Sequence, residues 1–356
     1  MGITGLRPVR LADVAKAAGV SQGTASNVFN RPNLVREEVR ERVVATAQAL
    51  GYAGPDPKGR LLRAGKVNAI GVATAEPLSY FFEDPFARAL MTGISEACDA
   101  SGAGISLVSA MSEEKLAWNI QSAVVDGFIL LCVEGGHRLV ELTQERKLPF
   151  VALELDSTND EVAGIGIDDF GGARAAAVHL AELGHRRFGV LAIQFVDDRV
   201  GPISPQEAEA GIYSSARDRW RGYLAGLAPY GIDAASLPVF ETQNERESVR
   251  EGLEYLFSLD PKPTAILAMS DRTALIAIEW LAEQGLSVPG DVSIVGFDGI
   301  PEAAKAIPPL TTVEQPIAGI GRRAVEMILE NKIPARREMM PVELVVRGTT
   351  APPRAG

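Results

Sequence analysis

From residue 69 onward the chain alternates short apolar runs with amphipathic stretches, and this alternation restricts the possible folds more than any other feature. The runs are AIGVAT, GISLVS, GFILLCV, FVALEL, FGVLAI, AILAMS and VSIVGFD. Continuous apolar runs separated by helical stretches are typical of parallel strands covered by helices on both faces. The strands are too many for one small sheet, and the longest break falls near residues 165–172. The pattern therefore predicts an α/β body of two doubly wound, parallel-sheet lobes.

The first 51 residues carry a different pattern, in which two short helices joined by a tight turn precede a third helix. Gly19 supplies the positive φ that such a turn requires, and Ser21 is a good N-cap for the second helix. The inward apolar positions are Leu11, Val14, Ala15 and Ala18, then Ala25, Val28 and Phe29, then Val39, Val43, Val44, Ala47 and Leu50. Their helical spacing predicts an all-α head.

The outward face of the predicted second helix consists of Gln22, Gly23, Ser26 and Asn27. Asparagine and glutamine make bidentate hydrogen bonds to adenine in the major groove, and the first turns of a recognition helix reach the base edges. This face indicates a helix-turn-helix that reads DNA. The alternative is a plain three-helix cap without a nucleic-acid partner.

Charge is distributed unevenly along the chain, whose formal net charge is −11. Residues 1–66 contain eleven Lys and Arg and five Asp and Glu, a net +6, so the remaining residues carry −17. A basic head on an acidic body places phosphate contacts in the head and repels DNA from the rest of the protein.

Membrane, secreted and enzyme classes fit the sequence poorly. No apolar run approaches the roughly 18 residues of a membrane helix, and the N-terminus lacks the order of a secretion signal, so we expect a cytoplasmic protein. Cys98 and Cys132 lie in apolar surroundings, which favours buried free thiols. His137, His179 and His185 lie in no arrangement that suggests a catalytic triad or a zinc site.

Two glycine-containing stretches resemble nucleotide-binding motifs but depart from their spacing. In GRLLRAGKV, five residues separate Gly59 from Gly65 instead of four, and Val67 lacks the magnesium-binding hydroxyl of a P-loop. GIGIDDFGG has the wrong spacing for a dinucleotide-binding turn. We therefore expect no enzyme activity, no cofactor and no metal.

The stretch LADVAKAAGVSQGTASNVFN, with VREEVRERVVATAQALGY after it, closely resembles the DNA-binding head of the lactose-repressor (LacI/GalR) family. The resemblance implies that Gln22, Gly23 and Asn27 read bases. The positions where the family contacts phosphates are Ser21, Thr24, Ser26 and Asn30. The chain departs from the family twice: Gly23 offers no side chain to a base, and Arg36 replaces the serine that commonly caps the third helix.

The segment YAGPDPKGRLLRAGK, residues 52–66, is either an ordinary linker or a hinge like that of the same family. The resemblance implies a short helix that forms on DNA, in which Arg60 contacts the duplex and Leu62 is a wedge between central base pairs. Apolar wedges in the minor groove unstack a base step and kink the duplex. Gly59 replaces the usual alanine, so we expect a less stable hinge helix.

The body resembles the effector domain of the same family, itself similar to periplasmic sugar-binding proteins, through HLAELGHRRFGVL, SDRTALIAIEWLAEQGLSVPGDVSIVGFDGIPEA and IPPLTTVEQP. Ligands of such sheets bind beyond the carboxyl ends of the strands, so the cleft between the lobes is the expected site. The resemblance implies that Arg219 grips the effector and that Asp298 hydrogen-bonds sugar hydroxyls. The other implied effector-binding residues are Glu154, Ser270 and Gln315, with Tyr80, Phe81 and Phe86 on a pocket loop after the first strand.

These features divide the chain into a helix-turn-helix domain (1–54), a hinge (55–66) and an effector-binding and dimerisation domain (67–350). We expect one lobe to comprise roughly 67–167 with 315–343, and the other 168–314 with 344–350. The predicted protein is a homodimeric repressor that binds palindromic operator DNA under the control of a sugar or polyol. The alternatives are a regulator that depends on a purine- or nucleoside-type co-repressor, and a sugar-binding protein without a regulatory role.

Overall fold

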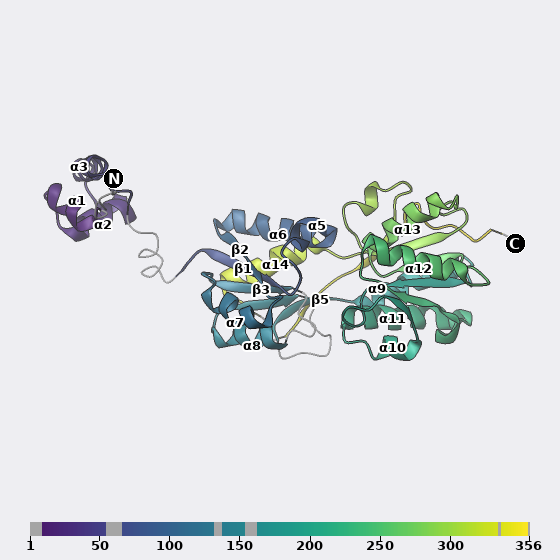
Figure 1. Cartoon of the computed structure of the whole chain (residues 1–356). Coiled ribbons are helices and arrows are strands. Elements are labelled where there is room, and N and C mark those ends of the chain that lie inside the picture. Colours follow the sequence, from purple (N-terminus) through teal and green to yellow (C-terminus); the bar gives the residue numbers. More distant parts are fainter. Residues whose placement is uncertain (1–8, 55–65, 132–136, 154–161, 334–335, 355–356) are drawn as a thin grey trace, which may run out of the picture. The chain divides into compact units, whose positions relative to one another are not determined.

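The computed structural model describes residues 9–54, 66–131, 137–153, 162–333 and 336–354. It divides into two compact units, Met1–Val67 and Asn68–Gly356, called here the head and the body (Figure 1). The predicted hinge residues Arg60 and Leu62 lie outside the described residues, as does Glu154.

Within residues 9–54 the head contains three α-helices, α1 (Leu11–Ala17), α2 (Gln22–Asn30) and α3 (Glu37–Leu50), and the 3-10 turn η1 (Pro32–Leu34). Gly19 has φ +66° in the turn between α1 and α2, and the Ser21 hydroxyl accepts a hydrogen bond from the amide of Thr24. The buried core is formed by Val14, Ala15, Ala18, Ala25, Val28, Val43 and Ala47. The predicted helix-turn-helix head is confirmed.

The first sheet of the body is parallel in every pair of strands that the structure describes. Its order is β12 (Glu338–Met340), β5 (Gly164–Ile167), β4 (Phe150–Leu153), β3 (Gly127–Leu131), β1 (Ala69–Thr74) and β2 (Gly104–Ser109). Its helices are α5 (Tyr80–Glu83), α6 (Pro85–Ser101), α7 (Glu113–Ser122), α8 (His137–Glu145) and α14 (Ile317–Glu330). Helices α6 and α14 cover one face and α7 and α8 the other (Figure 1).

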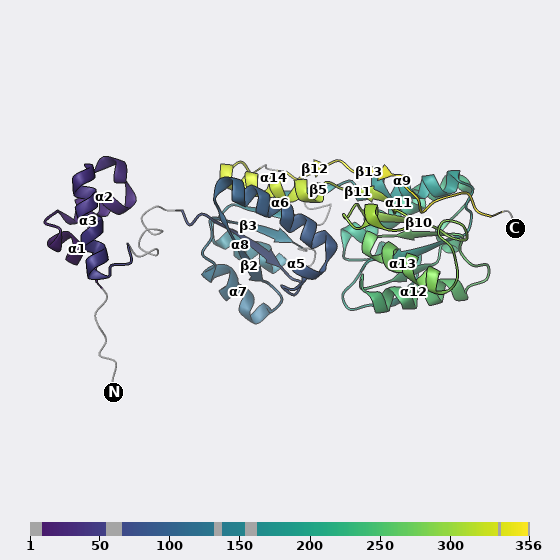
Figure 2. The same ribbon diagram turned by 90° about the horizontal axis from the view of Figure 1, so that it is seen from above.

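The second sheet has the order β13 (Glu343–Val345), β11 (Thr311–Glu314), β10 (Ser293–Asp298), β9 (Ala265–Ala268), β6 (Phe188–Ala192), β8 (Val239–Glu241) and β7 (Gly201–Ile203). Figure 2 shows α9 (Asp169–Glu182) and α11 (Ser214–Leu227) on one side, and α12 (Arg246–Ser258) and α13 (Asp271–Glu283) on the other. The shorter elements of this lobe are α10 (Pro205–Glu209), η2 (Ala228–Tyr230), η3 (Ala234–Ser236) and η4 (Ala303–Lys305). The α/β body of two doubly wound lobes is thereby confirmed.

The edges of the second sheet differ from the all-parallel expectation. Strand β7 pairs antiparallel with β8, and β13 pairs antiparallel with β11. Antiparallel edge strands on otherwise parallel sheets are common, because an edge strand needs no crossover helix to reach its place. Neither edge strand has the long apolar run that marks a central strand, and β7 contains Pro202.

Helices α9 and α11 approach each other closely at Gly222. A Cβ atom at this position would lie 2.4 Å from the carbonyl oxygen of Phe170 and 2.8 Å from the Cβ of Ala173. The missing side chain therefore allows α11 to pack directly on the first turn of α9, which places Arg219 beside Asp169.

We expect Gly222→Ala to destabilise the body by about 1–3 kcal/mol, because the added methyl group would force the two helices apart. Urea unfolding followed by tryptophan fluorescence measures this, since Trp118, Trp220 and Trp280 all lie in the body. The matched control is Gly104→Ala, where the nearest atom is 3.8 Å from the added Cβ. Equal urea midpoints for the two variants would contradict the predicted crowding.

Candidate functional sites

The outward face of α2 presents the residues that the sequence assigns to DNA. Gln22, Gly23 and Asn27 are exposed on this face. The other predicted contacts hydrogen-bond within the helix: Ser21 Oγ lies 2.8 Å from Thr24 Oγ1, and Asn30 Nδ2 donates to Ser26 Oγ over 3.1 Å. These bonds fix the orientation of the polar side chains around the exposed amides.

The inter-lobe pocket of the body has a volume of about 360 Å³ and takes its walls from both lobes. Its apolar lining is Phe86, Leu90, Leu131, Leu153, Ile165, Ile167, Phe170, Ile320 and Met339. Its polar lining is Asp168, Asp169, Ser214, Ser215, Asp218, Arg219, Gln315, Arg336 and Arg337, with the backbone of Gly166. The pocket thus combines a broad apolar wall with a few converging polar groups, as ligand sites do.

Arg219 lies at the centre of the polar wall and is only 5% exposed. Its Nε donates to Asp169 Oδ1 over 2.7 Å, and its Nη1 lies 3.7 Å from Asp298 Oδ1 and donates to the carbonyl oxygen of Met269. The guanidinium also stacks on the Phe297 ring, 3.7 Å from its centroid. Helices α9 and α11 and strand β10 therefore meet at one buried cation.

Burial and ion pairing oppose each other in this cluster. Burial raises the pKa of Asp169 above its ordinary value, although the charge and hydrogen bond of Arg219 act in the other direction. Burial also disfavours the charged guanidinium of Arg219, but Asp169 and Asp298 together raise its pKa, so it stays protonated. The cluster can offer hydroxyl groups both carboxylate acceptors and a fixed cationic donor.

Asp298 does not itself line the described pocket, but it contacts two residues of the polar wall, Gln315 and Arg219. Gln315 Nε2 donates to Asp298 Oδ1 over 2.9 Å, and the Gln315 amide donates to the Asp298 carbonyl over 3.1 Å. Both side chains are 8% exposed. Of the predicted effector residues, the structure therefore brings Arg219, Asp298 and Gln315 together, with Phe86 on the opposite, apolar wall.

Besides Asp298, three predicted effector residues in the described part of the chain, Tyr80, Phe81 and Ser270, do not line the pocket. Tyr80 and Phe81 lie on helix α5 rather than on a loop, and Phe81 is 2% exposed within the apolar core. Ser270 caps α13, where its hydroxyl accepts from the Thr273 amide over 3.0 Å and lies 2.5 Å from Asn244 Oδ1. Placing Tyr80 and Phe81 on a pocket loop was wrong, because the chain forms a helical turn there and buries the Phe81 ring.

The sequence did not predict Asp168, Asp169 and Phe170, which line the pocket and lie where β5 ends and α9 begins. Two aspartates at the end of a strand and the start of a helix are the signal that points to such a site, since ligands bind at the carboxyl ends of the strands. Arg336 and Arg337, just before β12, have no comparable signal. Among the described residues, no group of three or more His, Cys, Asp or Glu side chains could hold a metal ion.

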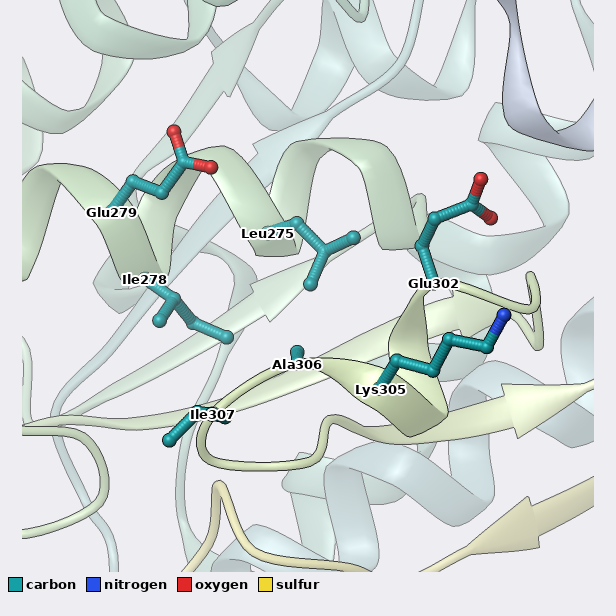
Figure 3. A pocket seen from close by; sticks show the side chains of 7 residues that line it. All are labelled: Leu275, Ile278, Glu279, Glu302, Lys305, Ala306 and Ile307. Atoms are coloured by element: carbon teal, nitrogen blue, oxygen red, sulfur yellow. The ribbon is translucent and has the colours of Figure 1, made fainter.

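A second hollow of about 420 Å³, called here the α13 hollow, lies on the surface of the second lobe. Figure 3 shows Leu275 and Ile278 of α13 facing the loop that carries Ala306 and Ile307. Glu279, Glu302 and Lys305 form its charged rim. Ile307 is 93% exposed, an unusual position for a large apolar side chain.

Comparison with known proteins agrees with this architecture. Residues 10–54 match the family model described as "Bacterial regulatory proteins, lacI family", and residues 177–350 match "Periplasmic binding protein-like domain". The chain is 36% identical to HTH-type transcriptional regulator Rv3575c of Mycobacterium tuberculosis, with 100% of both chains covered. It is 33% identical to HTH-type transcriptional regulator IpsA of Corynebacterium glutamicum, with 90% of each covered.

The chain belongs to the LacI family of bacterial transcriptional regulators. Among solved structures, this LacI-family regulator is similar to the lac repressor dimer bound to operator and the anti-inducer ONPF, with a TM-score of 0.76, 26% identity, and coverage of 97% of this chain and 100% of the other. It is also similar to the transcriptional regulator CelR in its cellobiose complex, with a TM-score of 0.67, 27% identity, and coverage of 96% and 100%. The family consists of DNA-binding regulators with a ligand-binding domain.

Two further observations concern expectations from the sequence. Within the described ranges, no helix is both long and apolar enough to span a membrane. Cys98 is a buried free thiol, as expected, whereas Cys132 lies outside the described residues.

Proposed function

We propose that this LacI-family regulator is a repressor that binds palindromic operator DNA and is released by a small ligand in the inter-lobe pocket. The observation that carries the proposal is that one chain contains both a DNA-reading face and a polar ligand pocket. The exposed amides of α2 are suited to base edges, and the buried cluster around Arg219 is suited to a polar ligand. The protein thus acts by binding rather than by catalysis.

We propose a neutral sugar or polyol as the effector, acting as an inducer. Among the described lining residues, three arginines stand against three aspartates, so the pocket favours neither a cation nor an anion by net charge. Arg219 and Asp298 can donate to and accept from vicinal hydroxyls, and Phe86 and Phe170 can pack against the C–H face of a ring. Cellobiose and ribose are bound in two similar structures of the family.

A nucleobase-type co-repressor is the second candidate. Phe86 belongs to one lobe and Phe170 to the other, so two aromatic side chains line the pocket from opposite sides. Aromatic side chains stack on planar bases as well as on sugar faces. The ligand screen described below separates the two candidates.

For the DNA contacts we propose that Gln22 and Asn27 read bases. In this proposal Ser21, Thr24, Ser26, Asn30 and Arg60 contact the DNA backbone, and Leu62 enters the minor groove. The exposure of Gln22 and Asn27 on α2 supports the first part. The net +6 of residues 1–66 supports the second, because phosphate contacts require basic surface.

We expect Asn27→Ala to weaken binding to the preferred site by roughly 1–3 kcal/mol and to change binding to random DNA little, because only base contacts depend on sequence. The preferred site comes from in vitro selection with the full chain, and fluorescence anisotropy measures both affinities at one salt concentration. Gln48→Ala, which removes an exposed amide from α3, is the control. Equal losses on both DNAs would show that Asn27 only positions the backbone.

The effector prediction uses Arg219→Lys, because Arg219→Ala would remove the cation that hydrogen-bonds the buried carboxylate of Asp169. Lysine keeps the charge but cannot reproduce the planar fork that reaches Asp169 and the Met269 carbonyl. A thermal-shift screen of sugars, polyols, nucleosides and nucleobases identifies the ligand, which stabilises by RT ln(1 + [L]/Kd). We expect Arg219→Lys to lose that shift and to keep binding DNA.

Arg221→Lys on the same helix is the matched control, since Arg221 is 44% exposed and pairs with Glu209 at the surface. It should respond to the ligand as the native chain does. If Arg219→Lys also showed the native thermal shift, the ligand would bind elsewhere.

We propose that the α13 hollow contacts a second copy of the chain. A palindromic operator requires two heads related by a two-fold axis, and the similar lac repressor structure is a dimer on its operator. The exposed Ile307 beside Leu275 and Ile278 offers an apolar patch with a charged rim, the usual arrangement of an interface.

We expect Ile307→Glu to convert a dimer of the 37.8 kDa chain into monomers in sedimentation-velocity experiments, because a carboxylate would then be buried in the apolar contact. Ile212→Glu, an exposed isoleucine elsewhere in the body, should remain dimeric. A native chain that sediments as a tetramer at micromolar concentration would contradict the proposed assembly.

A further inference from the structure

Asp271, at the start of α13, holds three segments of the second lobe together. It is fully buried, and its carboxylate accepts three hydrogen bonds. Oδ2 accepts from the amides of Gly299 and Ile300 over 2.7 and 2.9 Å, and Oδ1 accepts from Thr312 Oγ1 over 2.5 Å. One carboxylate therefore joins α13, the loop after β10 and strand β11.

The backbone of β10 leaves space for this carboxylate. A Cβ atom on Gly296 would lie 2.3 Å from Asp271 Oδ1, so any larger residue there would displace the aspartate. The carboxylate thus occupies the space that the missing side chain of Gly296 leaves beside β10.

The loop held by Asp271 begins immediately after Asp298, whose backbone is strained. Asp298 has φ +119°, a conformation that residues with side chains rarely adopt. Such strain persists only where the surroundings fix it. Asp271 fixes the following amide, and the Gln315 amide fixes the Asp298 carbonyl oxygen over 3.1 Å.

This constrained backbone directs the Asp298 side chain to the pocket cluster. Its Oδ1 accepts from Gln315 Nε2 and lies 3.7 Å from Arg219 Nη1. In the other direction, the same loop continues through Ile300 to Glu302 and Ile307 at the α13 hollow. Asp271 therefore holds a loop that runs from the pocket cluster to the α13 hollow, and Asp271 itself lines neither cavity.

We propose that Asp271 is a positioning residue of the effector site: by binding the amides of Gly299 and Ile300, it holds Asp298 against Arg219 and links it to the 299–307 loop. This inference rests on the proposed function of the inter-lobe pocket as the effector site. If a ligand displaces Asp298, the 299–307 loop then moves with it, because the amides of Gly299 and Ile300 are bound to the Asp271 carboxylate.

The charge state of Asp271 affects how strongly it holds these amides. Burial raises the pKa of Asp271 to about 7, while the bonds from Thr312, Ile300 and Gly299 and the charge of Arg347 oppose the rise. Arg347 in turn pairs with Glu314 of β11. A protonated carboxyl is a weaker acceptor for backbone amides than a carboxylate, so the loop should loosen as pH falls through this pKa.

Hydrogen exchange with mass spectrometry on the full chain without ligand tests the proposal. In Asp271→Ala, peptides spanning 298–303 should exchange faster on the order of tenfold, because a buried charge-assisted acceptor is lost. Asp271→Asn keeps one carbonyl oxygen for the two amides and should restore most of the protection. After correction for intrinsic rates, protection of these peptides in the native chain should fall below pH 7, whereas in Asp271→Asn it should not.

A merely structural role would increase exchange throughout the lobe, including α9, and would show no dependence on pH specific to this loop. The matched control is Asp291→Ala, which removes another acceptor of a loop amide, that of Ser287, before the start of β10 and outside the 298–303 peptides. If Asp271→Ala left the 298–303 peptides unchanged, or if the native chain and Asp271→Asn had the same pH profile, the proposal would be wrong. Because no ligand is used, this result is independent of the ligand screen, whose failure would instead count against the pocket itself.

Discussion

The buried ion cluster of Arg219 with Asp169 and Asp298 connects most parts of the body that bear on its function. It joins α11, α9 and β10, and Gln315 extends it to the segment that returns the chain to the first lobe. Removing one partner of a buried ion pair typically costs about 3–5 kcal/mol, because the remaining charge stays buried. The same residues therefore support the lobe and, under the proposed function, present its ligand-binding groups in a cluster that is already oriented.

The cluster also shows which parts of the site can be predicted from the sequence. Family resemblance identified Arg219, Asp298 and Gln315, and helical spacing with a glycine turn identified the head, because these features are local in the chain. Asp169 was not predicted although it is the nearer of the two carboxylates that pair with Arg219, because the two residues are 50 positions apart and meet only through the packing of α9 on α11. That packing depends on Gly222, whose role is visible only when the two helices are placed together.

The positions of two predicted effector residues outside the described pocket have an equally physical origin. Phe81 carries an aromatic ring suited to a sugar, but the ring gains more by burial in the core beneath α5 than by facing a pocket. Ser270 is a hydroxyl at the end of a strand, but the start of α13 needs an N-cap, and the hydroxyl serves that purpose. Residue type alone could not distinguish a ligand contact from a cap or a core position at these sites.

Two ion pairs across the lobes bear on how a ligand in the pocket can change their arrangement. Arg88 of α6 pairs with Glu302 over 2.5 Å, and Arg272 of α13 pairs with Asp84 over 3.2 Å. The Arg88–Glu302 pair is partly exposed, and such pairs typically contribute about 0–1 kcal/mol. The Asp84 carboxylate is buried, so breaking its pair with Arg272 would leave a buried charge.

Asp84 gives the second pair a further consequence. Its other oxygen accepts from the amide of Phe86 over 2.9 Å, so the carboxylate that faces α13 also fixes the first turn of α6, where Phe86 enters the pocket. A ligand shifts an equilibrium only by its difference in affinity for the two states, and couplings between sites are typically about 1–3 kcal/mol. Under the proposed function, a ligand that contacts Phe86 acts on the segment that Asp84 joins to the second lobe, and so biases the arrangement of the two lobes.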